Sequence, residues 1–178
     1  MFIIETSVFI LLHRAFVTFE KIFRMAALVV SSFDQFNQYL GQSLGQSKPH
    51  KITQDQINEF ATATLDHQWI HTDAERAKDG PFGKTIAHGY LTLSMVPYMW
   101  EQILQADNLK MMVNYGIDSL KFGQPVPVDS ELILKAKLQS LTNLRGVIKA
   151  EVGARMEIIG EKKPAFTATL ILLYHFNE

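Results

Sequence analysis

The sequence predicts an α+β domain in which a long apolar central helix is wrapped by a curved antiparallel sheet. Two observations support this prediction. Residues 86–104 are apolar almost all round, and a helix without a polar face must be enclosed by other elements. Three segments nearer the C-terminus alternate between apolar and polar residues, as strands with one buried face do.

Three helix starts are marked by capping boxes, in which a Ser or Thr is followed three residues later by Glu or Gln. They predict helices over Phe33–Leu40, Gln54–Thr64 and Asp73–Lys78, opened by Ser32, Thr53 and Thr72 respectively. Gly41 ends the first helix, and a Gly/Ser-containing turn over 41–48 leads to a short extended piece over 49–52.

The central helix and the sheet follow. Pro97 falls inside the apolar segment, where a proline bends a helix or disturbs its preceding turn. Met111–Phe122 reads as a strand. The alternating segments after it run over residues 131–138, 148–158 and 166–176. Because Thr142-Asn143 and Gly160–Pro164 join them, they predict an antiparallel meander.

Length and composition fit an ordinary globular domain. The chain has 178 residues, of which 47% are hydrophobic and 20% are charged, enough for one sizeable core. Lys and Arg (17) nearly balance Asp and Glu (18), so we expect no nucleic-acid partner. The absence of cysteine excludes disulfides, thiolate metal sites and a cysteine nucleophile. It is compatible with a reducing compartment, and we expect a cytoplasmic protein.

Residues 1–24 are apolar but fit neither a signal peptide nor a membrane span. Glu5 precedes the apolar run, where a secretory signal carries positive charge. Charges at Arg14, Glu20 and Lys21 interrupt the run, so we expect no stable membrane insertion; an amphipathic surface helix stays open. We interpret 1–24 as an extension that is either not native, with Met25 as the true start, or poorly ordered. Residues 25–178 are then a single domain.

The most informative segment lies between Asp66 and Gly89. Asp66 and His71 are five residues apart and can form a proton-transfer pair if the chain between them is not one continuous helix. Gly89 stands just inside the next helix start, where a bare N–H can face a developing negative charge. The structural alternatives are a turn or cap for Asp66, a half-buried residue before a cap for His71, and close backbone packing for Gly89.

The chain resembles a known family in these residues. It is similar to the MaoC-like dehydratases, which include the (R)-specific enoyl-CoA hydratases and a branch around nodulation protein N. The similarity lies in Asp66-His67-Gln68-Trp69-Ile70-His71, Gly80-Pro81-Phe82-Gly83 and Ile86-Ala87-His88-Gly89-Tyr90-Leu91. It continues in Asn114-Tyr115-Gly116 and Phe122-Gly123-Gln124-Pro125-Val126, and covers about residues 32–178.

This resemblance implies a hotdog fold, usually as a homodimer, and an enzyme of acyl-thioester and fatty acid metabolism. In the family the matching Asp and His hold a water that adds across the 2,3 double bond of an enoyl thioester. The matching glycine N–H binds the thioester oxygen. Asp66, His71 and Gly89 are therefore the expected catalytic residues. The expected reaction is hydration of trans-2-enoyl-CoA, or dehydration of 3-hydroxyacyl thioesters of coenzyme A or an acyl carrier.

The chain departs from the usual hydratase pattern at three places. Gln68-Trp69 replaces Asn-Pro between the Asp and the His, Pro97 replaces a serine that some members carry, and His67 adds a polar group beside the pair. Two other functions stay open: a hotdog acyl-CoA thioesterase, and a non-catalytic acyl-thioester-binding protein, which the missing Asn-Pro favours.

Four further residues are expected to bind substrate around the pair. They are Gln68, Trp69, Gly83 and His88. Trp69 also fits a core position, Gly83 a turn and His88 a structural neighbour at the helix start. No metal and no other cofactor is expected, because the remaining histidines lack partners at metal-ligand spacing.

Overall fold

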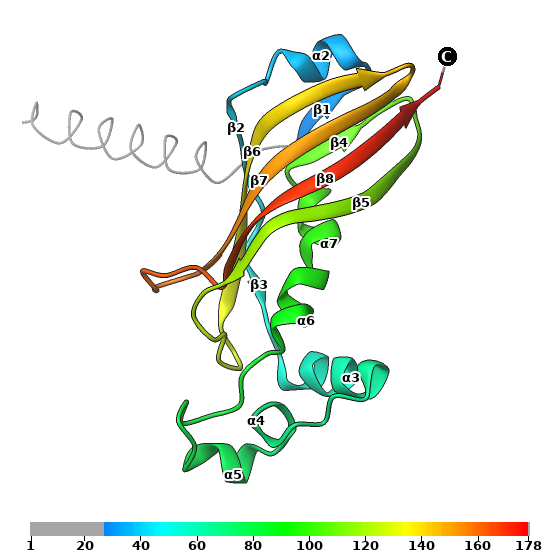
Figure 1. Ribbon diagram of the computed structural model, residues 1–178. Coiled ribbons are helices and arrows are strands. Elements are labelled where there is room, and N and C mark those ends of the chain that lie inside the picture. Colours follow the sequence, from blue (N-terminus) through cyan, green and yellow to red (C-terminus); the bar gives the residue numbers. More distant parts are fainter. Residues whose placement is uncertain (1–26, 178) are drawn as a thin grey trace, which may run out of the picture.

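The fold is described by a computed structural model for residues 27–177 (Figure 1). The extension expected over residues 1–24 lies outside the described residues. A six-stranded sheet curves over the central helix, and three short helices lie beyond one end of the sheet.

The main sheet is built around the predicted meander. Its strands are β2 (Ser43–Gln46), β3 (His50–Lys51), β5 (Leu109–Phe122), β6 (Glu131–Leu144), β7 (Val147–Ile158) and β8 (Phe166–Phe176). β6, β7 and β8 pair antiparallel in chain order, and β5 pairs with β8 at one edge. At the other edge β6 pairs with both β2 and β3. The sequence analysis assigned 41–48 to a turn and missed β2.

Burial along the strands confirms the alternation. Every second residue of β7 is buried, and β8 follows the same pattern over most of its length. The predicted turn at Thr142-Asn143 is wrong, because these residues still belong to β6. The turn lies at Arg145-Gly146, where both residues have positive φ (55° and 97°). Two successive positive φ values match the two-residue turn that fits the twist of a hairpin.

The observed helices agree with those predicted from the capping boxes, with two exceptions. They are α2 (Phe33–Asn37), α3 (Gln54–Thr64), α4 (Trp69–Thr72), α5 (Ala74–Lys78), α6 (Gly89–Ser94) and α7 (Val96–Trp100). The Thr53 capping box is confirmed with both of its hydrogen bonds. α2 stops earlier than expected. The Thr72 box is wrong, because Thr72 ends α4 and the Asp73 side chain caps α5 by accepting from the Arg76 N–H.

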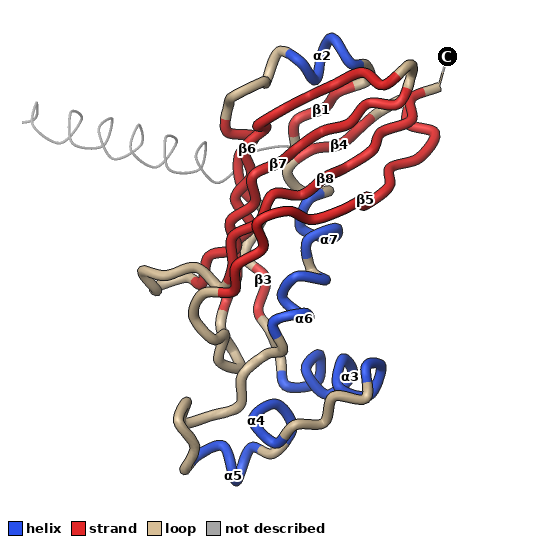
Figure 2. The backbone as a smooth tube through the Cα atoms, in the orientation of Figure 1, coloured by secondary structure: helices blue, strands red, loops and turns tan. Residues whose placement is uncertain are grey.

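The central helix is shorter than predicted and is interrupted. It begins at Gly89 rather than Ile86, and α6 and α7 are separated at Met95 (Figure 2). Pro97 lies in the first turn of α7, where its missing N–H has no intrahelical acceptor to lose. Leu104, the predicted last helical residue, belongs to a strand.

The core lies between the central helix and the concave face of the sheet. Met99 and Trp100 of α7 are buried there with the inward residues of the strands, among them Leu134, Val152 and Leu172. This arrangement confirms the predicted α+β class. A small parallel sheet of β1 (Leu28–Val30) and β4 (Leu104–Ala106) was not predicted.

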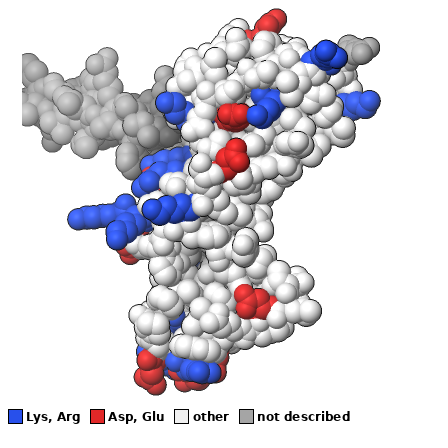
Figure 3. Space-filling view, in the orientation of Figure 1, with Lys and Arg blue, Asp and Glu red and all other residues white. Residues whose placement is uncertain are grey.

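The distribution of charge and the length of the helices agree with what the sequence predicts. On the face seen in Figure 3, acidic and basic side chains both occur and no single sign covers the visible surface. Within residues 27–177, the helices are all too short or too polar to cross a lipid bilayer.

Candidate functional site

The loop between α3 and α4 brings the predicted acid and imidazole together. α3 ends at Leu65, which takes a left-handed conformation (φ 63°), and Asp66 follows it. α4 then supplies His71, and His88 stands at the N-cap of α6. One carboxylate oxygen of Asp66 and one nitrogen from each ring lie within 4.8 Å of one another. Side chains that are up to 22 residues apart in the sequence therefore share one small volume.

His71 is held in a single tautomer. It is 7% exposed, and its Nδ1 lies 2.7 Å from the Ile86 carbonyl oxygen. Because a carbonyl only accepts hydrogen bonds, Nδ1 carries the proton and Nε2 keeps a free lone pair. Burial lowers the pKa of His71, and the Ile86 hydrogen bond opposes that shift in part. His71 is thus a neutral base at pH 7.

His88 packs directly on His71. The two rings stack with 3.8 Å between centroids and 25° between planes, and His88 is only 3% exposed. Its Nε2 donates to the Asp66 backbone carbonyl oxygen at 3.0 Å. Its Nδ1 is buried without a hydrogen-bond partner among the described residues. His88 therefore contacts both members of the pair: it binds the Asp66 backbone and stacks on the His71 ring.

Asp66 differs from both histidines in its surroundings. Its side chain is 54% exposed, and its Oδ1 accepts a long hydrogen bond of 3.4 Å from the Gln68 N–H. The carboxylate is thus open to water on one side, and on the other its Oδ2 lies 3.9 Å from Nε2 of the buried His88, with a His71 ring nitrogen within 4.8 Å of the carboxylate. Such a pair can hold a water molecule between a solvated acceptor and a desolvated base.

A cavity of about 190 Å³ lies beside His71 and reaches Gly89. Its wall is made of residues from α6, from the end of β5 and from the loop after β5: Gly89, Thr92, Phe122, Gly123, Gln124 and Val126. Gly89 is the first residue of α6, so its N–H has no intrahelical acceptor. Among the described residues no other group accepts from that N–H. It is free to bind an oxygen atom in the cavity.

The other predicted substrate-binding residues lie around the site but do not line this cavity. Gln68 is exposed at the N-cap of α4. The Trp69 ring packs against Gly80, and the Arg76 guanidinium lies 4.4 Å from its centroid. Gly83 has a left-handed φ of 70° in a turn, where its N–H donates to the Gly80 carbonyl. Of the seven predicted site residues, the structure brings Asp66, His71 and His88 into one cluster and gives His71 and Gly89 a common cavity, which neither Asp66 nor His88 lines.

Three residues near the site were missed by the sequence analysis. Gln54 donates from its amide to the His71 carbonyl oxygen at 2.8 Å and accepts from the Thr85 hydroxyl at 2.5 Å. Thr92 is buried, and its hydroxyl donates to the Gly89 carbonyl at 2.7 Å. Phe122 covers Gly89 from β5. The Gln54 and Phe122 contacts join segments that only the fold brings together, and the Thr92 bond lies within α6, where its residue type alone does not mark a site.

Asp66, His71 and His88 are also the one group among the described residues with three possible metal ligands in reach of each other. A metal ion lies close to the plane of each imidazole that binds it. The His71 and His88 planes are stacked and nearly parallel, so their nitrogens do not converge on one point. The arrangement suits proton transfer better than metal binding.

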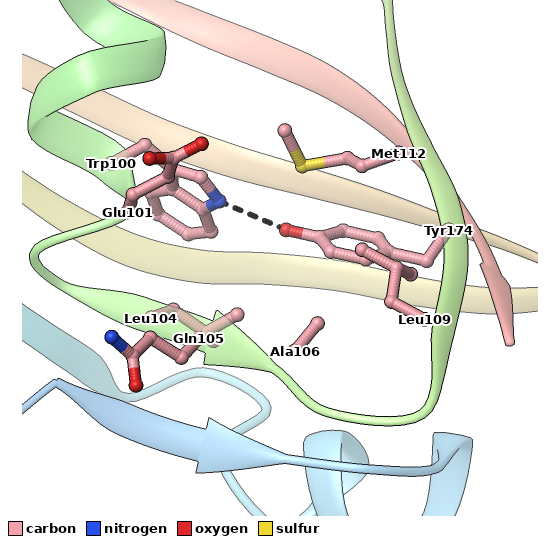
Figure 4. A pocket seen from close by; sticks show the side chains of 8 residues that line it. All are labelled: Trp100, Glu101, Leu104, Gln105, Ala106, Leu109, Met112 and Tyr174. Carbon is pink, nitrogen blue, oxygen red and sulfur yellow. Dashed lines mark hydrogen bonds between the residues drawn. The ribbon is translucent and has the colours of Figure 1, made fainter.

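A larger cavity lies at the other end of the central helix and carries different chemistry (Figure 4). It measures about 460 Å³ and lies between α7, β4, β5 and β8. Trp100 donates from Nε1 to the Tyr174 hydroxyl at 3.0 Å, and both residues line the cavity. Among the described residues that line it, Glu101 is the only carboxylate and there is no imidazole. The smaller cavity is therefore the candidate active site.

Comparisons with known proteins point to one family. A family model described as "MaoC like domain" matches residues 35–158. The 3-hydroxyacyl-thioester dehydratase Z of Mycobacterium tuberculosis is 43% identical over 135 residues, which cover 75% of this chain and 89% of that protein. Nodulation protein N of Rhizobium meliloti is 38% identical over 149 residues, covering 82% of this chain and 92% of that protein.

Solved structures share the fold at lower sequence identity. A monoamine oxidase regulatory protein from Archaeoglobus fulgius has a TM-score of 0.70 at 22% identity, covering 86% of this chain and 100% of that one. An (R)-hydratase from A. caviae has a TM-score of 0.62 at 23% identity, covering 75% of this chain and 94% of that one. These likenesses confirm the predicted hotdog fold.

Proposed function

The chain belongs to the MaoC-like dehydratase family, and from this premise we propose that it hydrates trans-2-enoyl thioesters and catalyses the reverse dehydration of 3-hydroxyacyl thioesters. One observation carries the proposal. The neutral His71, with a free Nε2, meets the solvent-accessible Asp66 carboxylate beside a cavity that ends at Gly89.

The proposed reaction adds the elements of water across one double bond. The Asp66–His71 pair holds a water molecule and takes one of its protons, and the water oxygen bonds to C3 of the enoyl group. The π electrons of the double bond move onto the thioester oxygen as an enolate. The pair then returns one proton to C2, which restores its protonation state. Dehydration follows the same steps in reverse.

The Gly89 N–H stabilises the enolate oxygen in this scheme. A glycine leaves room for a carbonyl close to the backbone, and the cavity beside it is shielded by Phe122 and Val126. A fixed N–H donor in such a site is worth roughly 3–4 kcal/mol of activation free energy. In this proposal, the absence of a side chain at position 89 lets the thioester oxygen reach the backbone N–H.

The residues around the pair take supporting roles in the proposal. His88 holds the Asp66 backbone and the plane of the His71 ring through the contacts described above. Gln68, Trp69 and Gly83 shape the loops that border the site, and through them the entry of the substrate.

The central experiment is hydration of crotonyl-CoA by wild type, Asp66→Asn and His71→Gln. We expect each substitution to slow hydration by at least about 100-fold, the usual contribution of a general acid or base. The circular dichroism spectrum should be unchanged. His67→Ala is the matched control, because this imidazole precedes His71 by four residues but is exposed. Wild-type rates in both site variants would overturn the proposal.

The same assay separates the two alternative functions. Loss of the conjugated enoyl thioester absorbance reports hydration, whereas a thiol reagent reports release of free coenzyme A by a thioesterase. An acyl-thioester-binding protein would bind the ligand and give neither signal.

We also propose that the protein is a homodimer that pairs through β5. β5 is the last strand of the sheet, with β8 on one side only. Large apolar side chains are exposed along it: Met111, Val113, Tyr115, Ile117 and Phe122. An apolar edge strand is a surface that proteins cover, and a second copy of β5 would do so by extending the sheet.

The dimer is tested by measuring mass in solution by light scattering. Val113→Lys places a charge on the exposed face of β5, and we expect it to shift the protein toward monomer. Thr169→Lys, on the neighbouring strand β8, is the control and should leave the mass unchanged. A monomeric wild type would contradict this part of the proposal.

A further inference from the structure

Phe122 occupies the space above the proposed oxyanion donor. It is the last residue of β5, and its ring lies against the α-carbon of Gly89. A Cβ atom placed on Gly89 would stand 3.0 Å from Cε1 of that ring and 3.2 Å from Cδ1. The ring therefore fills the volume that a side chain at position 89 would take, and it forms one wall of the His71 cavity.

The ring is held in place from several sides. It makes an edge contact with Tyr90 (5.8 Å between centroids, 78°) and another with Phe166 (6.4 Å, 79°). Its backbone pairs with Phe166 across the sheet. A Cβ atom on the next residue, Gly123, would collide with the Pro164 carbonyl oxygen, so the backbone that follows Phe122 packs closely against the segment before β8. Phe122 is a fixed wall on its inner side.

A fixed wall at this place limits what an acyl group can carry next to its carbonyl carbon. If the thioester oxygen binds the Gly89 N–H, the carbonyl carbon lies beside Gly89 and C2 is one bond further. The cavity there measures about 190 Å³, below the roughly 300 Å³ at which ligand pockets usually begin. A substituent on C2 would have to share this volume with the aromatic ring.

We propose that Phe122 sets the selectivity of this site, admitting acyl thioesters unbranched at C2 and rejecting those with a methyl group there. This inference rests on the proposed function for the position of the thioester. It extends that function by naming the class of acyl group, and Phe122 acts by contact with the substrate and takes no part in proton transfer.

Binding of saturated thioesters tests the inference without turnover. The probes are butyryl-CoA and 2-methylbutyryl-CoA, measured by calorimetry with wild type, Phe122→Leu and Phe122→Ala. We expect wild type to prefer butyryl-CoA by at least about 10-fold, the smallest usual effect of one methyl group in a tight pocket. Phe122→Ala should remove most of this preference, and Phe122→Leu part of it. Phe82→Ala is the matched control, because Phe82 has the same 41% exposure but does not line the cavity.

Turnover of crotonyl-CoA and 2-methylcrotonyl-CoA then separates this inference from the proposed function. If Phe122→Ala changes the binding preference and no variant hydrates either substrate, the selectivity role stands and the hydratase proposal fails. If wild type hydrates crotonyl-CoA but neither Phe122 variant changes the preference, the selectivity role is overturned. Phe122→Leu decides the matter where Phe122→Ala does not fold.

Discussion

Replacing Gln54 by Leu tests how the fold holds His71, the imidazole of the proposed catalytic pair. Gln54 opens α3, and its amide bridges two segments distant in sequence. It donates to the His71 carbonyl oxygen and accepts from the Thr85 hydroxyl. Thr85 is 1% exposed, so no water can replace the lost partner. The substitution therefore removes both of these hydrogen bonds, together with an exposed one from the amide to the Asn58 side chain, and it leaves a buried hydroxyl unsatisfied.

The expected cost follows from these contacts. Each hydrogen bond contributes about 1 kcal/mol net, and an unsatisfied buried polar group costs about 1–3 kcal/mol. We expect Gln54→Leu to lower the free energy of unfolding by about 3–5 kcal/mol. Because displacing a reacting group by about 1 Å costs up to roughly 100-fold in rate, hydration of crotonyl-CoA should slow by about 10- to 100-fold.

Urea unfolding and the enoyl absorbance assay measure the two effects, and two further variants dissect them. Asn58→Ala removes only the exposed partner of the Gln54 amide (2.9 Å) and should change stability by less than about 0.5 kcal/mol. Gln54→Glu keeps an acceptor for Thr85 but loses the donor to His71. We expect Gln54→Glu to slow hydration about as much as Gln54→Leu does, but to lower the free energy of unfolding less than Gln54→Leu does. A Gln54→Leu variant with wild-type stability and rate would refute the reasoning.

Three other outcomes are expected. Tyr174→Phe leaves the buried Trp100 N–H without its acceptor and should lower the free energy of unfolding by about 1–3 kcal/mol, measured in urea, while crotonyl-CoA hydration is unchanged. Gly123→Ala places a methyl group against the Pro164 carbonyl oxygen, so both the melting temperature and hydration should fall. Burial lowers the pKa of His71, so the folded state binds fewer protons than the unfolded state just below pH 6.5. The free energy of unfolding should fall as the pH drops below this value, and urea unfolding of His71→Gln should show a weaker dependence.

The sheet was predictable because each strand carries its own signal. In β7 the alternation of apolar and polar residues matches the burial of every second residue. The turn before β7 was misplaced because Thr142 and Asn143 suit a turn by composition. The pair Arg145-Gly146 fits the hairpin twist better, and the alternation ends too early to show how far β6 extends.

The central helix shows the opposite case. Its residues are apolar because the sheet encloses the helix. This apolar character does not indicate the residue at which the helix begins. Ile86 and Ala87 are as apolar as the helix but are extended, because they pair with the loop after β5 through the Val126 carbonyl and Pro127. A contact between segments about forty residues apart decides that boundary, and no local pattern records it.

Of the candidate site, the sequence predicted the groups proposed to react but not the residues that hold them. Asp66, His71 and Gly89 were recognisable by residue type and spacing, and the structure places Asp66 beside His71 and gives His71 and Gly89 a common cavity. The supports Gln54 and Thr92 are ordinary polar residues in helices. The Gln54 bond to the His71 carbonyl depends on the tertiary fold, whereas the Thr92 bond to the Gly89 carbonyl lies within α6 and only its place beside the cavity depends on the fold.

The five-residue spacing of Asp66 and His71 brings them together because the chain turns just before Asp66 and is not helical again until α4 begins. In one continuous helix, residues five apart point about 140° away from each other. Here Leu65 reverses the chain after α3, and Gln68 is extended before the single turn of α4. His71 is then fixed by the Ile86 carbonyl, which the sheet end holds in place, whereas Asp66 is fixed by His88 and the end of α3. Asp66 and His71 are thus held by different residues, His88 and Ile86. Because both of these lie just before α6, the segment that leads into α6 sets the distance between Asp66 and His71.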